Sequence, residues 1–241
     1  MDRLIYLAMS GAKAAMQRQD VLANNLANAS TTGFRAELQA FRAVPVRGDG
    51  ASTRVYALES TVGYDAQAGP VRTTGRDLDV AVHGNAWLSV QALDGTEAYT
   101  RAGSLQVNSE GLLVTPSGLP VLGDGGPITL PANAAVEIAA DGTVTAAVAN
   151  GRPQQAGRLK LVTSEAPLLR GEDGLFRGAD GDLTADPAAR VQSGALEGSN
   201  VSPVETMVAM ISAARQFEQQ MKMLQTSEQK EQAAAKLLAA Q

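Results

Sequence analysis

The two ends of the chain carry the feature that most restricts its fold, an apolar stripe at helical spacing. Near the N-terminus, steps of three and four residues join Ile5, Ala8, Ala12, Ala15, Gln19, Leu22 and Leu26, with Met9, Met16 and Ala23 beside them. Such steps place side chains on one face of an α-helix. The pattern predicts an amphipathic helix from Arg3 to Asn28, about 39 Å long at 1.5 Å per residue.

A second stripe lies near the C-terminus. Its members are Met207, Met210, Ala214, Phe217, Met221 and Leu224. Ser202-Pro203-Val204-Glu205 marks the helix start, because Ser caps, Pro suits the first helical position and Glu reaches back to the cap. Helical residues continue to Leu238, which gives a rod of about 54 Å. The two helices bury their stripes most simply by pairing with each other or with copies of themselves.

The middle of the chain has a different pattern. Residues 41–73 contain Pro and a Gly-Asp-Gly and show no helical stripe, so they read as an extended linker. Beyond them, short apolar runs alternate with turn pairs such as Asp94-Gly95 and Asp141-Gly142, which is typical of β-hairpins. The runs are Leu78–Val82, Trp87–Gln91, Leu105–Val107, Leu112–Val114, Val136–Ala139, Val144–Ala147 and Leu159–Thr163.

The predicted fold class is therefore α+β, with long N- and C-terminal helices packed as a coiled-coil-like pair around an inserted all-β domain. Four segments are expected along the chain. They are a helical segment at 1–40, the linker at 41–73, the β-domain at 74–197 and a second helical segment at 198–241 that packs with the first.

Composition narrows the functional classes. The 241 residues include no Cys and one His, which excludes disulfides, thiolate metal sites, cysteine nucleophiles and two-histidine metal sites. A net charge of −5 argues against nucleic acid as a partner. No run approaches the roughly 18 apolar residues of a transmembrane helix. The N-terminal "LIYLAMSGA" resembles a signal peptide, but Asp2 offsets Arg3 and the apolar pattern continues past Lys13, so we expect no cleaved signal.

An acidic cluster is the strongest candidate for chemistry. It contains Glu172, Asp173, Asp180 and Asp182. Asp-Gly repeats can bind calcium, but the 12-residue loop spacing with a terminal Glu is absent, and hairpin turns use Asp-Gly for backbone reasons alone. We expect turns and no metal site.

Other candidate groups also favour structural roles. Asp77 and Asp79 could act as an acid–base pair, but no aromatic platform or polar cluster accompanies them, so an edge or turn role is favoured. His83 lacks a G-x-S-x-G nucleophile and is expected in a loop. Trp87 is expected in the core. The sequence predicts no catalytic, cofactor-binding or metal-binding residue and no enzyme activity.

The end of the N-terminal helix carries three asparagines, although Asn is a poor helix former. Asn28 is interpreted as lying at or near the helix C-terminus. Asn24 and Asn25 are either solvated or form hydrogen bonds across subunits, where an amide fixes register by donating and accepting. After them, Gly33 is free to take a positive φ and Phe34 is a possible anchor.

These terminal motifs resemble a known family. "VLANNLANASTTGFR" is similar to the N-terminal signature of the flagellar rod and hook proteins, and "GALEGSNVSPVETMVAMISAARQFEQQMKMLQT" to their C-terminal signature. Residues 73–123 resemble the opening of their shared β-domain. The start, the "FRAVPV" segment and the length look most like proximal-rod subunits. Gly84-Asn85-Ala86-Trp87 stands where distal-rod relatives have "G-x-G-F-F", and this difference also favours the proximal-rod resemblance.

The resemblance implies a structural subunit of the bacterial flagellar basal body. Such proteins leave the cell unfolded through the flagellar type III export apparatus without a cleaved signal and polymerise in the periplasm. They form the axial drive shaft that transmits torque from the membrane ring and motor to the hook. The implied partners are copies of the chain, the proximal and distal rod subunits and the export apparatus. The alternative is a secreted β-rich protein that binds calcium or carbohydrate through its Asp clusters.

The side chains expected to form the assembly interface come from both ends. They are Ile5, Met9, Ala12, Met16, Leu22, Asn24, Asn25, Leu26, Asn28 and Phe34, together with Met207, Met210, Ile211, Ala214, Phe217, Met221 and Leu224.

Overall fold

A computed structural model describes residues 2–45, 55–60, 63–132, 134–148 and 152–239. The chain forms two compact units, which are described separately. The helical unit contains residues 1–28, 37–62 and 201–241, and the β unit contains residues 29–36 and 63–200. Each unit is therefore assembled from segments that are distant in the sequence.

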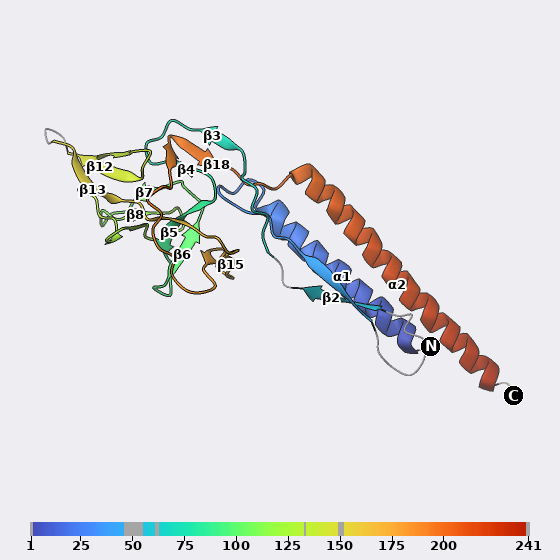
Figure 1. Cartoon of the computed structure of the whole chain (residues 1–241). Coiled ribbons are helices and arrows are strands. Elements are labelled where there is room, and N and C mark those ends of the chain that lie inside the picture. Colours follow the sequence, from blue (N-terminus) through green and yellow to red (C-terminus); the bar gives the residue numbers. More distant parts are fainter. Residues whose placement is uncertain (1, 46–54, 61–62, 133, 149–151, 240–241) are drawn as a thin grey trace. The chain divides into compact units, whose positions relative to one another are not determined.

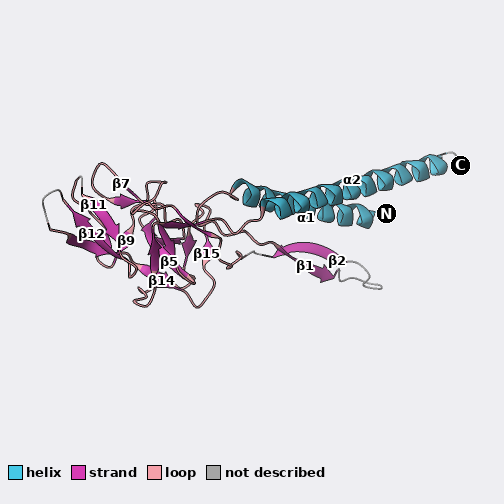
Figure 2. Cartoon of the chain, turned by 90° about the horizontal axis from the view of Figure 1, so that it is seen from above, coloured by secondary structure: helices cyan, strands magenta, loops and turns pink. Residues whose placement is uncertain are grey.

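Two antiparallel helices dominate the helical unit. Helix α1 spans Asp2–Ala27 and α2 spans Pro203–Ala239. They lie side by side, with the N-terminus of α1 and the C-terminus of α2 at the same end of the pair (Figures 1 and 2). The predicted helix boundaries are confirmed to within one residue, and so is the predicted pairing of the two helices.

The two helices meet through small side chains. The buried positions with small side chains are Ala8, Ala12 and Ala15 on α1 and Thr206, Ala213 and Ser227 on α2. A Cβ at Gly11 would lie 2.9 Å from Cδ of Gln220, which shows how closely the helices approach. Small residues at a helix contact allow this short separation.

The face of α2 that packs on α1 is turned by one position from the stripe read in the sequence. Met210, Phe217 and Leu224 are half-buried as expected, whereas Met207 and Met221 are exposed. Thr206 and Ala213 take the buried places because their short side chains fit the close contact with α1. The larger methionines are left on the outside.

The region interpreted as an extended linker contains a hairpin. Strand β1 spans Ala40–Pro45 and β2 spans Val55–Ser60. They pair antiparallel from Ala40 opposite Ser60 to Pro45 opposite Val55. The β2 strand packs near α1 (Figure 1). Residues 46–54 and 61–62 of this region lie outside the described part of the chain.

The β unit is built from short strands joined mainly in antiparallel pairs. Its first eight strands are β3 (Val71–Thr73), β4 (Val80–Val82), β5 (Ala86–Gln91), β6 (Glu97–Thr100), β7 (Gln106–Val107), β8 (Leu113–Val114), β9 (Leu122–Gly123) and β10 (Gly126–Pro127). The others are β11 (Ala135–Ile138), β12 (Thr143–Ala147), β13 (Gln154–Arg158), β14 (Leu161–Thr163), β15 (Leu169–Arg170), β16 (Phe176–Arg177), β17 (Val191–Ser193) and β18 (Ala195–Glu197).

The largest sheet of the β unit has the strand order β14-β5-β6-β16-β15, and a three-stranded sheet has the order β11-β12-β13. The described part of this unit also contains four two-stranded ladders, β17-β4, β18-β3, β7-β8 and β9-β10, and isolated bridges. All seven apolar runs singled out in the sequence overlap a strand. The β18-β3 ladder joins residues from opposite ends of the unit.

Asp-Gly turns set the hairpins, as predicted. In the β5–β6 turn, Gly95 has a φ of 83°, and the Thr96 N–H donates to Oδ1 of Asp94 at 2.9 Å. The β11–β12 turn repeats this arrangement with Asp141 and Thr143 at 3.0 Å. Glycine reaches such a φ without steric cost, and the Asp carboxylate binds the backbone two residues ahead.

The β unit has two apolar clusters. The larger one is aliphatic and includes Leu88, Val90 and Leu113, all fully buried. The smaller one is aromatic: the Trp87 and Phe176 ring centroids lie 4.6 Å apart, and the half-buried Tyr64 packs edge-on against Phe176 at 4.8 Å. The core position predicted for Trp87 is confirmed, with 5% of its surface exposed.

Candidate assembly interface

Five of the predicted interface residues are large apolar side chains on the outside of the helix pair. They are Met9 and Met16 on α1 and Met207, Ile211 and Met221 on α2. The first four expose 51–57% of their surface to solvent, and contiguous apolar surface of this kind marks interaction sites. These side chains are available to a neighbouring molecule.

The other apolar members lie closer to the contact between the helices. Ala12 is buried, and the half-buried residues are Ile5, Leu22 and Leu26 on α1 and Met210, Ala214, Phe217 and Leu224 on α2. Each half-buried side chain has part of its surface inside the helical unit and part outside. These residues support the pair and border the exposed set.

Sequence reasoning missed two members of the exposed set. Val204 and Val208 are 72% and 62% exposed, and with Met207 and Ile211 they form an apolar patch on the first turns of α2. The signal was present, because Val204, Met207 and Ile211 are separated by steps of three and four. We call these four residues the α2 patch.

The asparagines bind within the chain. The Asn25 side chain donates from Nδ2 to the Glu37 carbonyl at 2.9 Å, and the Glu37 N–H donates to its Oδ1 at 2.8 Å. Asn24 donates to Oε2 of Glu37 at 2.9 Å. Asn28 follows the last residue of α1, as expected, and donates to the carbonyl of Asn24 at 2.9 Å. The amide of Asn25 is therefore used inside the helical unit.

Within the β unit, residues 29–36 form a tight segment. Gly33 has a φ of 69°, as expected, and a Cβ there would collide with the backbone of Arg101. The ring of Phe34 is buried beneath the Arg170 guanidinium, whose central carbon lies 4.7 Å from the ring centroid. Asn200, which the sequence did not single out, accepts the Ala36 N–H at 2.7 Å. Phe34 therefore anchors this segment inside its own chain.

A buried ion triad joins this segment to the other end of the unit. Nη1 of Arg35 lies 2.8 Å from Oε1 of Glu197, and Nε of Arg101 lies 2.7 Å from Oε2 of Glu197. All three side chains are at most 2% exposed. Sequence reasoning missed the triad. The only signal was that Arg35 and Glu197 belong to the two terminal motifs that resemble the flagellar proteins.

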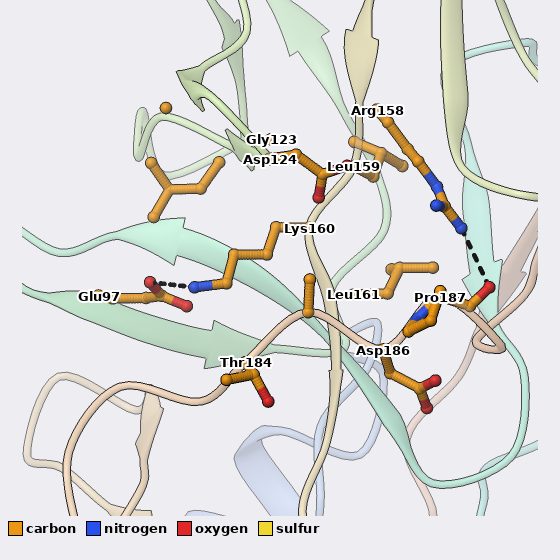
Figure 3. A pocket seen from close by; sticks show the side chains of 13 residues that line it. Glu97, Gly123, Asp124, Arg158, Leu159, Lys160, Leu161, Thr184, Asp186 and Pro187 are labelled. Atoms are coloured by element: carbon orange, nitrogen blue, oxygen red, sulfur yellow. Dashed lines mark hydrogen bonds and ion pairs between the residues drawn. The ribbon is translucent and has the colours of Figure 1, made fainter.

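The β unit also has an open cleft of about 640 Å³, drawn in Figure 3. Lys160 reaches across it to Oε2 of Glu97 at 2.7 Å, and Arg158 donates to the Pro187 carbonyl at 3.2 Å. Asp186 accepts from Thr163 at 2.7 Å, and its N–H donates to the carbonyl of Leu161. These contacts hold residues 184–187 against β14. These charged side chains are therefore paired with groups of the β unit.

Two of the acidic residues considered for catalysis or calcium, Asp173 and Asp79, bind other side chains of the β unit. Asp173 lies in the β15–β16 turn, where its hydrogen bond with Arg177 holds the pKa of the carboxyl below its ordinary value. Asp79 is buried, and its carboxylate accepts hydrogen bonds from Arg76 and Thr74. His83 lies in the β4–β5 turn, as expected. In the described residues, no three His, Asp or Glu side chains gather where they could hold a metal ion.

Three family models match the chain. Residues 5–35 match the flagella basal body rod protein model, residues 81–146 the D1 domain of the flagellar hook protein FlgE/F/G model, and residues 192–237 the C-terminal model of the flagellar basal body rod FlgEFG proteins. The matched ranges include most of α1, part of the core of the β unit and most of α2.

Full-length relatives decide the assignment. The chain is 49% identical to the flagellar basal-body rod protein FlgF of Salmonella typhimurium over 251 aligned residues, which cover 99% of both chains. The chain belongs to the FlgF family of flagellar basal-body rod proteins. The FlgF protein of Escherichia coli is also 49% identical over 93% of both chains, whereas the FlgG protein of Bacillus subtilis is 32% identical over 95% of this chain.

Membership in the FlgF family makes this chain a structural, non-enzymatic subunit of the flagellar rod. A rod protein is assembled with other axial subunits of the flagellum. No helix in the described ranges combines the length and apolar character that crossing a membrane requires.

Proposed function

We propose that the α2 patch and the exposed methionines of α1 are the lateral contacts through which the subunit joins its neighbours in the proximal rod. The observation that carries this proposal is the α2 patch itself. Its four side chains, Val204, Met207, Val208 and Ile211, expose between 51% and 72% of their surface within three helical turns. Removing apolar surface from water contributes about 25 cal/mol per Å², so covering this patch stabilises an assembly.

The inner and outer faces of the two helices have different roles in this proposal. Small residues such as Ala8 and Ala213 fill the contact inside the subunit, and the large apolar side chains remain outside. A rod needs contacts between different surfaces of identical or related subunits, because such contacts continue without closing. An outer face on α2 and another on α1, with Met9 and Met16, provide two such surfaces.

In this proposal the neighbours are copies of the chain and the adjoining proximal and distal rod subunits, and the assembly transmits torque from the membrane ring and motor to the hook. Of the interface residues predicted from the sequence, Met9, Met16, Met207, Ile211 and Met221 belong to the exposed faces. Phe34 and Asn25 contribute indirectly, because each holds its own segment in place.

We further propose that the subunit reaches the periplasm through the flagellar export apparatus with its N-terminus intact. The support is the use of the N-terminal apolar run in the folded helical unit, where Ala8 and Ala12 pack within the α1–α2 contact. Cleavage after Ala12 or Ala14 would remove these residues. Intact-mass measurement of the subunit from purified basal bodies is expected to give the uncleaved N-terminus, and a shortened chain would contradict this.

The interface is tested by placing a charge in the α2 patch. Ile211→Asp is expected to abolish swimming and leave few assembled rods, whereas Ser212→Asp, at the adjacent exposed position, is expected to support both. Circular dichroism of both purified variants checks that each remains helical. Normal rods built from folded Ile211→Asp subunits would contradict the proposal.

A further inference from the structure

The buried triad places two cations around one carboxylate. Glu197 uses each oxygen for a different arginine, Oε1 for Arg35 and Oε2 for Arg101. Arg101 is held in place independently, because its Nη atoms donate to the carbonyls of Val82, Gly84 and Ala86 at 2.6–2.9 Å. Arg101 is therefore a fixed positive charge, and Arg35 is brought close to it.

The surroundings of Arg35 include groups that disfavour its charged form. Burial lowers its pKa, and the like charge of Arg101 lowers it further, while Glu197 acts in the opposite direction. Asp65 adds a weaker attraction. Arginine does not give up its proton in proteins, so without Glu197 two buried guanidinium groups would repel each other in a medium that screens charge poorly.

Glu197 also holds backbone from separate parts of the sequence. Its carbonyl accepts the Gly33 N–H at 2.8 Å, and its Oε1 accepts the Gly69 N–H at 2.9 Å. Close to it, Asn200 receives the Ala36 N–H on Oδ1 and donates from Nδ2 to the carbonyl of Asp65 at 3.0 Å. Glu197 and Asn200 thus each bind the backbone of residues 29–36 and the backbone of residues 65–69.

We propose that Glu197 is an electrostatic latch: it closes the β unit around residues 29–36 by offsetting the repulsion between Arg35 and Arg101. Without the carboxylate, the segment stays detached. A cavity of about 340 Å³ beside the triad, lined by Arg35, Tyr64, Trp87 and Arg101, gives the Arg35 side chain room to move away from Arg101.

Because of the order of these residues in the chain, the latch can form only after Glu197 is present. Both arginines precede Glu197, so a chain that emerges from its N-terminus contains the repelling pair before it contains the carboxylate. Arg35 and Glu197 are also far apart in sequence, and closing a long loop costs conformational entropy before the contact stabilises it. Residues 29–36 therefore attach only after the β unit has folded as far as Glu197. This inference concerns folding and does not rest on the proposed assembly surfaces.

Amide hydrogen exchange on the full-length monomer tests the latch. In Glu197→Gln, which keeps the shape but removes the charge, we expect exchange at the Gly33 and Ala36 amides to accelerate at least about tenfold. The matched control is Glu97→Gln, which removes the charge from the Lys160–Glu97 pair of the same unit. Exchange at Gly33 and Ala36 is expected to stay near its wild-type rate in the control.

A double variant separates a latch from a simple loss of hydrogen bonds. Arg35→Gln/Glu197→Gln removes the repulsion, so exchange at Ala36 is expected to be slower than in Glu197→Gln, although more contacts are lost. If Glu197→Gln fails to fold, the same logic applies to the soluble yield, which the double variant is expected to recover. The proposal is overturned if Glu197→Gln exchanges like Glu97→Gln, or if the double variant is no better protected or more soluble than Glu197→Gln.

Discussion

The side-chain amide of Asn25 pairs with the backbone of Glu37 in both directions, with Nδ2 donating to its carbonyl and Oδ1 accepting its N–H at 2.9 and 2.8 Å. This pairing explains why an asparagine stands near the end of α1. The buried amide extends the hydrogen bonding of the helix end to the chain that returns from residues 29–36. An aspartate or an alanine at this position could not do both.

Asn25→Ala is expected to lower the free energy of unfolding by about 2 kcal/mol, because it leaves both backbone groups of Glu37 without their partners. Asn24→Ala removes two exposed side-chain bonds, one donated to Glu37 and one accepted from Asn28, and is expected to cost less than about 0.5 kcal/mol. Denaturant unfolding of the two purified monomers measures both. Equal effects would contradict the role assigned to Asn25.

The same pair of residues tests hydrogen bonding across subunits. If Asn24 also contacts a neighbour, Asn24→Ala should reduce swimming even though the monomer keeps its stability. Normal assembly and swimming of Asn24→Ala/Asn25→Ala would remove any intersubunit role for these amides.

Gly33→Ala is expected to destabilise the β unit more than Gly75→Ala. Both glycines have a positive φ, 69° and 73°, which costs an alanine about 1 kcal/mol. Only Gly33 faces the backbone of Arg101, whereas Gly75 has open space. The excess, expected to be about 1–3 kcal/mol, therefore measures the close approach of residues 29–36 to Arg101. Matching thermal melts for the two variants would mean that this approach is not tight.

Truncation places the boundary of the β unit. Removing residues 1–28 is expected to leave the β unit folded, because residues 29–36 remain. Removing residues 1–36 takes away Arg35 and Phe34 and is expected to lower the melting temperature of the β unit markedly. Near-ultraviolet circular dichroism of Trp87 follows both truncated chains. Indistinguishable melts would show that the β unit does not depend on residues 29–36.

The buried hydroxyl of Tyr99 is expected to make the free energy of unfolding fall at high pH. Burial raises the pKa of its hydroxyl to about 12, and that hydroxyl accepts the Leu183 N–H at 2.6 Å. The unfolded tyrosine titrates near its ordinary value of about 10. The stabilisation is therefore complete below about pH 10 and is lost as pH rises toward 12. Unfolding midpoints measured across this range should fall more for the wild type than for Tyr99→Phe.

The sequence predicted the parts of this molecule that depend on local patterns. Steps of three and four place α1 and α2 within one residue of their observed ends, and Asp-Gly pairs place the hairpins of the β unit. The α2 patch was partly missed because the buried face of α2 is selected by the fit of Thr206 and Ala213 to α1. The steps of three and four from Val204 to Ile211 indicate an apolar face on α2, but spacing alone does not indicate which face packs on a helix that is distant in the sequence.

The buried triad could not be predicted for a related reason. Apart from their place in the two terminal motifs, nothing in the neighbourhood of Arg35 or Glu197 distinguishes them from surface charges, because their burial arises from contacts between distant parts of the β unit. The order of the strands in the sheets could not be predicted either, because strands that are distant in the sequence pair with each other, β14 with β5 and β18 with β3. The roles of the asparagines depended on Glu37, whose backbone position no pattern in α1 indicates.

The central claim is that the α2 patch contacts neighbouring subunits in the rod, and photo-cross-linking in purified basal bodies tests it most directly. A photoreactive residue at Ile211 is expected to give adducts with rod subunits, which mass spectrometry identifies, whereas the same residue at Ser212 is expected to give few. Strong adducts from Ser212 with none from Ile211 would contradict the claim.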